Sequence, residues 1–164
     1  MFALIIAIIA IALTVYLAVS TLFYGGDALS NGSARAIASS FINQGQQVNG
    51  AHTLYKNDNA GAKIGTNLDL LVTGNYLSSK PVPQAGNAWA VDESFDHDGD
   101  TGTTTAALTV IKSTNAALPG GTKTIADEVC KLIQDQAGTG SATFGCVGAS
   151  SPTDTTDNVV WYRI

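Results

Sequence analysis

The first 24 residues of the chain form an apolar run that carries no charged side chain and only three aliphatic hydroxyl residues, Thr14, Ser20 and Thr21. A helix rises about 1.5 Å per residue, so a run of this length spans the roughly 30 Å hydrocarbon core of a bilayer. Ile, Ala, Leu and Val occur on every side of such a helix, and no face of it is suited to water. The sequence therefore predicts a helix that is enclosed by lipid, by other protein, or by each in turn.

A secretory signal peptide is the competing interpretation of this run. Such a peptide has a basic n-region, a shorter apolar core and a small-residue cleavage site. No Lys or Arg precedes the apolar run here, and the first charged residue of either sign is Asp27. These features favour a hydrophobic membrane or packing helix over residues 1–26, with the N-terminus on the cytoplasmic side and residues 27–164 exported as one domain.

The composition of the chain argues against a nucleic-acid partner and predicts a disulfide. Charged residues make up 13% of the chain and the net charge is -5, so the basic footprint of a nucleic-acid-binding protein is missing from the sequence as a whole. The two cysteines, Cys130 and Cys146, both fall in the predicted exported domain, where an oxidising compartment would let them pair. Closing a loop of about 15 residues stabilises a fold by roughly 3 kcal/mol. The alternative is two buried free thiols.

An amphipathic helix is predicted to follow the apolar run. Gly25 and Gly26 each cost about 1 kcal/mol inside a helix, and we expect a break there. Residues 27–55 then carry an apolar stripe with a seven-residue spacing and a polar opposite face. The stripe contains Ala34, Phe41, Val48 and Tyr55, flanked by Ile37 and Ala51. The polar face contains Ser33, Ser40, Gln44, Gln47 and Asn49.

The rest of the chain reads as an α+β fold in which the long N-terminal helix packs on a C-terminal antiparallel sheet domain with a second helix. Residues 56–63 have turn composition, and a short helix weakened by Gly74 precedes an extended connection at Pro81 and Pro83. The β-rich stretches are residues 88–95, 105–112 and 158–164. The second helix is predicted over residues 122–138, with Thr124 as N-cap, Gly138 at its end and Cys130 on it.

Few residues qualify as a chemical site. Asp96, Asp98 and Asp100 resemble an oxygen-ligand calcium loop, but their spacing departs from an EF-hand and favours a solvated turn. His52 and His97 are too isolated to form a zinc site, and a lone histidine is usually exposed or hydrogen-bonded. The nucleophile-elbow, zinc-protease and C-x-x-C motifs do not occur in the sequence. We therefore expect a protein that is not an enzyme and that binds no cofactor.

Taken together, the chain resembles a type IV pilin, and among these it is most similar to the type IVb and conjugative-type pilins. The resemblance covers most of the chain and is carried by four features. These are the uncharged helix MFALIIAIIAIALTVYLAV, the amphipathic continuation, the segment LVTGNYLSSKPVP, and the cysteine pair that brackets the last part of the chain. Its specific signal lies in the first 55 residues and in the two cysteines.

The resemblance implies a life cycle and a set of partners. A prepilin peptidase would remove a short basic leader and methylate the new N-terminus, which here would be Met1. The subunit would reside in the inner membrane until the pilus assembly machinery adds it to an extracellular homopolymeric filament. Such a filament has roles such as cell adhesion. The filament core would contain Phe2, Leu4, Ile5, Ala7, Ile9, Leu13 and Leu17.

One position departs from the family. Most pilins have a glutamate where this chain has Ile5, and that glutamate is thought to meet the terminal amine of a neighbouring subunit. A buried ammonium without a partner costs several kcal/mol. We expect a backbone carbonyl, or the hydroxyl of Thr14 or Ser20 in a neighbour, to take its place.

Polymerisation also follows from the residues without the resemblance. An all-round apolar helix attached to an exported domain leaves the bilayer only if other copies replace the lipid, and a heterologous contact that does not close generates a filament. Small residues, among them Ala3, Ala7, Ala10, Ala12 and Ala18, would let neighbouring helices approach closely. Two alternatives remain open: a minor pilin or type II secretion pseudopilin, and a single-span membrane protein whose periplasmic domain binds a ligand or partner.

Overall fold

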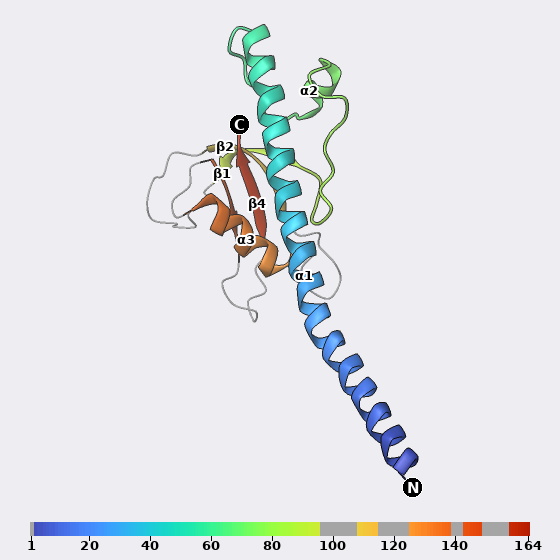
Figure 1. The fold of residues 1–164 in the computed structure, drawn as a ribbon. Coiled ribbons are helices and arrows are strands. Elements are labelled where there is room, and N and C mark those ends of the chain that lie inside the picture. The colour runs from blue at the N-terminus through green and yellow to red at the C-terminus, as the bar shows by residue number, and fades with distance from the viewer. Residues whose placement is uncertain (1, 96–107, 115–124, 139–142, 149–157) are drawn as a thin grey trace, which may run out of the picture. The chain divides into compact units, whose positions relative to one another are not determined.

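The computed structural model describes residues 2–95, 108–114, 125–138, 143–148 and 158–164 (Figure 1). Within them the chain forms three helices and four strands. It divides into two compact units, Met1–Ala34 and Arg35–Ile164. This division falls later than the predicted domain boundary after residue 26. The described buried apolar residues all lie at Ala34 or beyond, so the hydrophobic core belongs to the second part of the chain.

The first helix, α1, runs from Phe2 to Asp58. Its backbone is helical at Gly25 and Gly26, so the helix break expected at these residues is not present in the structure. Each glycine costs about 1 kcal/mol relative to alanine. Helix formation is cooperative, and the long helical stretches on either side offset that cost.

The later part of α1 buries the stripe that its sequence spacing predicts. Phe41, Val48 and Ala51 are at most 4% exposed, and Ala34 is also buried. Tyr55, at the end of the stripe, is half-buried. The apolar spacing of residues 34–55 is therefore the face that α1 contributes to the core.

One residue of the predicted polar face, Gln44, is half-buried and bonded to later parts of the chain. Gln44 donates its Nε2–H to the carbonyl of Val82 at 3.0 Å and accepts at Oε1 from the indole Nε1–H of Trp89 at 2.8 Å. Trp89 also packs edge-on against Phe41, with ring centroids 5.7 Å apart. The amide of Gln44 therefore ties α1 to the start of the sheet, which the helical spacing alone did not indicate.

The end of α1 matches the predicted turn. Asn59 Nδ2 donates to the carbonyl of Tyr55, and the N–H of Gly61 donates to the carbonyl of Lys56 at 2.7 Å. Ala60 and Gly61 have positive φ angles of 54° and 85°, which reverse the chain out of the helix. The expected short helix follows as α2, Asp69–Thr73, and Gly74, which was expected only to weaken it, is its C-cap.

The four strands form one antiparallel sheet in the order β1-β2-β4-β3. They are β1 (Ala90–Phe95), β2 (Leu108–Thr114), β3 (Phe144–Val147) and β4 (Val159–Arg163). Ile111 on β2 is paired with Tyr162 on β4, and Cys146 on β3 is paired with Val160 on β4. The predicted antiparallel sheet and the α+β class are confirmed, and the apolar stretch around Cys146 supplies an edge strand.

One sheet face receives α1. Gly45 of α1 lies so close to the ring of Tyr162 that a Cβ there would overlap it. The rings of Tyr162 and Phe144 stack on each other, 5.9 Å apart at an interplanar angle of 6°. Because alternate residues of a strand share a face, Val160 and its partner Cys146 lie on this same side of the sheet.

The helix α3, Asp127–Ala137, begins later than predicted. Its N-cap is Ala126, which makes no side-chain cap, and the predicted N-cap Thr124 lies outside the described residues. Asp127 and Glu128 in the first turn interact favourably with the positive end of the helix dipole, and this interaction compensates for the absent cap. The predicted end at Gly138 is confirmed, with φ at 77°.

Candidate functional site

The most unusual surface of the described chain is the N-terminal part of α1. Its large side chains are exposed on every side of the helix, from Phe2 at 81% to Val19 at 48%. Water around such a surface is costly, at about 25 cal/mol for each Å² of apolar area. Soluble monomers rarely expose contiguous apolar patches of this extent, so the surface is built for lipid or protein neighbours.

The residues predicted for a filament core all belong to this surface. Each is exposed, and together they surround the helix instead of lining one side of it. The set is Phe2, Leu4, Ile5, Ala7, Ile9, Leu13 and Leu17. Within the described residues of one chain they meet no buried core, because that core begins at Ala34. Their role therefore depends on neighbours outside the chain.

The three aliphatic hydroxyls of this segment are satisfied inside the helix, whereas Tyr16, which carries a phenol hydroxyl, is 72% exposed. Thr14 Oγ1 donates to the carbonyl of Ile11 at 2.8 Å, and Ser20 and Thr21 donate to the carbonyls of Leu17 and Ala18. A backbone or hydroxyl group left unpaired in hydrocarbon costs several kcal/mol. Each hydroxyl oxygen still has lone pairs that accept a further hydrogen bond, as the expected role of Thr14 and Ser20 toward an ammonium requires.

The length of the segment matches a bilayer. Residues Phe2–Thr21 have a mean hydropathy of 2.9 over a helix long and apolar enough to cross a membrane. Twenty residues of helix span about 30 Å, the thickness of the hydrocarbon core. A membrane anchor and a signal sequence both satisfy this test of length and composition.

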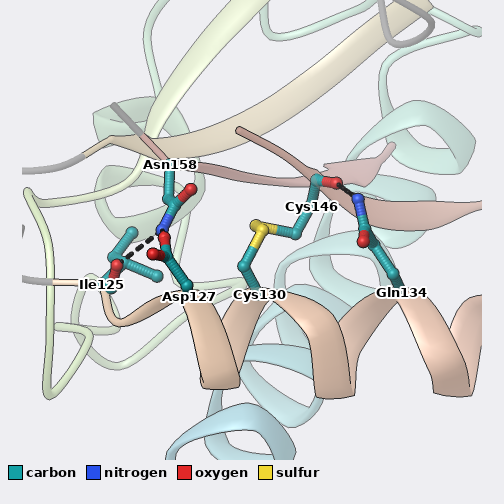
Figure 2. Close-up of a disulfide and its surroundings, with 6 residues drawn as sticks. All are labelled: Ile125, Asp127, Cys130, Gln134, Cys146 and Asn158. Atoms are coloured by element: carbon teal, nitrogen blue, oxygen red, sulfur yellow. Dashed lines mark hydrogen bonds between the residues drawn. A yellow bond between two sulfur atoms is a disulfide. The ribbon is translucent and has the colours of Figure 1, made fainter. Parts of the chain in front are cut away.

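The predicted disulfide is present. Cys130 on α3 and Cys146 on β3 are bonded, with Cα atoms 5.3 Å apart (Figure 2). Gln134, one helical turn after Cys130, donates its Nε2–H to the carbonyl of Cys146 at 2.6 Å. The alternative of two free thiols is therefore wrong, and the bridge fixes α3 to the edge of the sheet.

A second connection holds the start of α3. Asn158, which immediately precedes β4, is 1% exposed and donates from Nδ2 to the carbonyl of Ile125 and to Asp127 Oδ1, both at 2.8 Å (Figure 2). Its amide thus bridges the residues that open α3 to the central strand β4. These contacts make the region around the disulfide a structural junction between α3 and the sheet.

His52 departs from the expectation for a lone histidine. It is 1% exposed, and neither Nδ1 nor Nε2 has a hydrogen-bond partner in the described structure. Burial lowers the pKa of its imidazole below the usual 6.5, and the positive charges of Lys56 and Lys63 lower it further. The signal in the sequence was its position four residues after Val48, on the buried face of α1.

Several predicted site residues lie outside the described residues. These are the calcium candidates Asp96, Asp98 and Asp100, together with His97 and the N-methylation candidate Met1. Among the residues that are described, no group of three or more His, Cys, Asp or Glu side chains is arranged to hold a metal ion.

Comparisons with protein-family models, with curated proteins and with solved structures give no match to this chain. The candidate site is therefore defined by its own geometry: an exposed apolar helix of membrane length, followed by an α+β domain with a disulfide.

Proposed function

We propose that the chain is the major structural subunit of an extracellular type IV pilus. The subunit resides in the inner membrane before assembly and polymerises through residues 1–26. The observation that carries this proposal is the exposure of apolar side chains on all sides of Phe2–Thr21. An anchor needs only length and hydropathy. A filament subunit additionally has to exchange lipid for copies of itself, and an all-round apolar surface serves both environments.

Two further features support the proposal. The hydroxyls of Thr14, Ser20 and Thr21 bond to their own helix, so these three groups move between lipid and protein without being left unpaired. The Cys130–Cys146 bridge suits a domain exported to an oxidising compartment.

Shearing cells and imaging the released material by electron microscopy tests polymerisation. Ala7→Lys and Ile9→Asp each place a charge in the filament core, at a cost of about 2.5–3.5 kcal/mol. A helix with a mean hydropathy of 2.9 tolerates one such charge during membrane insertion. We expect both variants to remain in the membrane fraction and to release no filaments.

The matched control is Ile9→Leu, which preserves apolarity and volume and should assemble normally. Normal filaments from Ala7→Lys or Ile9→Asp would contradict the placement of these residues in the core. A chain that stays in the inner membrane as a monomer, with no filaments from the unmodified protein, would favour the single-span ligand- or partner-binding protein. Rare incorporation into filaments made of another subunit would favour a minor pilin or pseudopilin.

A further inference from the structure

His52 lies in the core as an imidazole without hydrogen bonds. It shares a face of α1 with Val48, and the two side chains are 1% and 0% exposed. Neither ring nitrogen has a partner in the described part of the chain. A buried polar group left unpaired costs about 1–3 kcal/mol, and a buried charge costs considerably more. The site therefore accepts the neutral ring and opposes the imidazolium.

The charged groups at this end of α1 reinforce the same preference. Lys56 lies one helical turn beyond His52, and Lys63 is on the loop that follows α1; both act against a positive charge on the ring. The nearby carboxylate of Asp58 accepts a hydrogen bond from the Tyr76 hydroxyl at 2.9 Å. The ring of Tyr55 packs on Tyr76, and Asp69 on α2 is paired with Lys80 at 2.6 Å.

Residues 62–77, here called the α2 segment, pack at this end of α1. Ile64, Leu68 and Leu71 are at most 4% exposed and form the apolar side of the segment. Tyr76 attaches it to α1 by the bond to Asp58 and by its edge-on contact with Tyr55, at 5.6 Å between ring centroids. Both attachments lie at the surface of the domain.

The α2 segment is held by local backbone bonds and by surface contacts such as the ion pair of Asp69 with Lys80, and it belongs to no described strand ladder or disulfide. Its helix has five residues and no side-chain cap at Leu68. In contrast, the four strands share backbone ladders, and α3 is held by the disulfide. Local opening starts where few buried contacts and few protected hydrogen bonds hold a segment.

We propose that protonation of His52 at mildly acidic pH releases the α2 segment from the end of α1, while the sheet and α3 stay folded. The imidazolium needs water. The α2 segment lies next to this part of α1, since its Lys63 acts on the charge of His52 and its Tyr76 packs on Tyr55, so lifting it is an opening that can supply that water. This inference does not depend on whether the chain polymerises.

The direction of the pH effect follows from linkage. In the closed state the pKa of His52 is lowered, and in the open state it returns to about 6.5. The closed state is therefore fully favoured above pH 6.5 and loses stability as the pH falls below it. If the His52 ring stays neutral in the closed state, the population of the open state rises about 4-fold at pH 6.0 and about 30-fold at pH 5.0, relative to its population well above pH 6.5.

Hydrogen–deuterium exchange of the full chain in detergent micelles tests the proposal. Protection factors, corrected for the intrinsic pH dependence of exchange, are compared at pH 7.5, 6.0 and 5.0. We expect peptides from residues 62–77 to lose protection up to about 30-fold at pH 5.0, following the linkage limit. Peptides from β2 and β4 should keep theirs.

Variants separate His52 from other acid effects. His52→Leu removes the titration and keeps an apolar side chain, so it should abolish the loss of protection. His97→Gln removes the other histidine of the chain and should leave the loss unchanged. Equal protection at all three pH values, or the same acid response in His52→Leu, would overturn the proposal. If His52→Leu does not fold, an NMR titration of the unmodified chain decides: a His52 pKa of 6.5 or above refutes it.

Discussion

At the scale of single residues, the closest approach between α1 and the sheet depends on the absence of a side chain. Gly45 faces Tyr162, whose ring is in turn stacked on Phe144. The ring therefore cannot move aside freely. Glycine is normally a weak residue in a helix, and here the loss in helix propensity is offset by the packing that it permits.

This contact makes Gly45→Ala destabilising even though alanine is the better helix former. We expect the free energy of unfolding to fall by about 1–3 kcal/mol, the usual cost of overpacking. Equilibrium denaturation of the full chain in micelles measures it.

The control is Gly50→Ala on the same helix. A Cβ at Gly50 meets nothing within 4 Å. This variant should gain up to about 1 kcal/mol from helix propensity. Changes of the same sign in both variants would show that Gly45 does not lie against Tyr162.

At the scale of the elements, α3 owes its stability to its attachments to the sheet more than to its own helix-forming tendency. It is an 11-residue helix without a side-chain cap, and isolated helices of this length are marginal in water. The disulfide to β3 and the bonds of Gln134 and Asn158 supply the missing stability. The helix therefore depends on its junction with the strands.

Removing the bridge should lower stability without abolishing the fold. For the double variant Cys130→Ala and Cys146→Ala we expect a loss of about 3 kcal/mol in the free energy of unfolding, as for a closed loop of this length. Denaturation with far-UV circular dichroism measures the loss.

Reduction of the unmodified chain serves as the control and should reproduce that loss. The hydrogen bonds of Gln134 and Asn158 do not need the bridge, so the folded spectrum should persist. An unchanged free energy of unfolding would contradict this prediction and would mean that the other contacts alone hold α3 on the sheet.

At the scale of the whole molecule, the two compact units differ in the exposure of their apolar side chains. The described large apolar side chains of Phe2–Thr21 are exposed, whereas the described core begins at Ala34. The first unit therefore needs neighbours, and the second contains its own core. We attribute insertion and assembly to the first unit, and the outer surface of the proposed filament to the second.

Deleting residues 1–30 should leave a folded domain that stays in solution without detergent. Because no described core residue is removed, we expect its melting temperature to lie within about 4 °C of that of the full chain in mild detergent, the shift equivalent to about 1 kcal/mol for a chain of this size. Thermal circular dichroism measures this. Aggregation or a missing transition in the deleted protein would show that the first unit completes the fold.

The sequence by itself determined the features that depend on local pattern. The length and hydropathy of the apolar helix, the buried stripe through Phe41 and Val48, the end of α3 at Gly138 and the pairing of the cysteines were all predicted correctly. Helical periodicity and composition are properties of neighbouring residues. The expected break at Gly25 and Gly26 was wrong because helix cooperativity is not visible in two residues taken alone.

The tertiary structure decided which distant segments meet. The strand order β1-β2-β4-β3 and the bonds of Gln44 to Val82 and Trp89 join residues far apart in the chain. The burial of His52 without a hydrogen bond also appears only once the domain is assembled. A sequence pattern shows which face of a helix turns inward. It does not show which partners arrive there, because long-range packing selects them jointly from the whole chain.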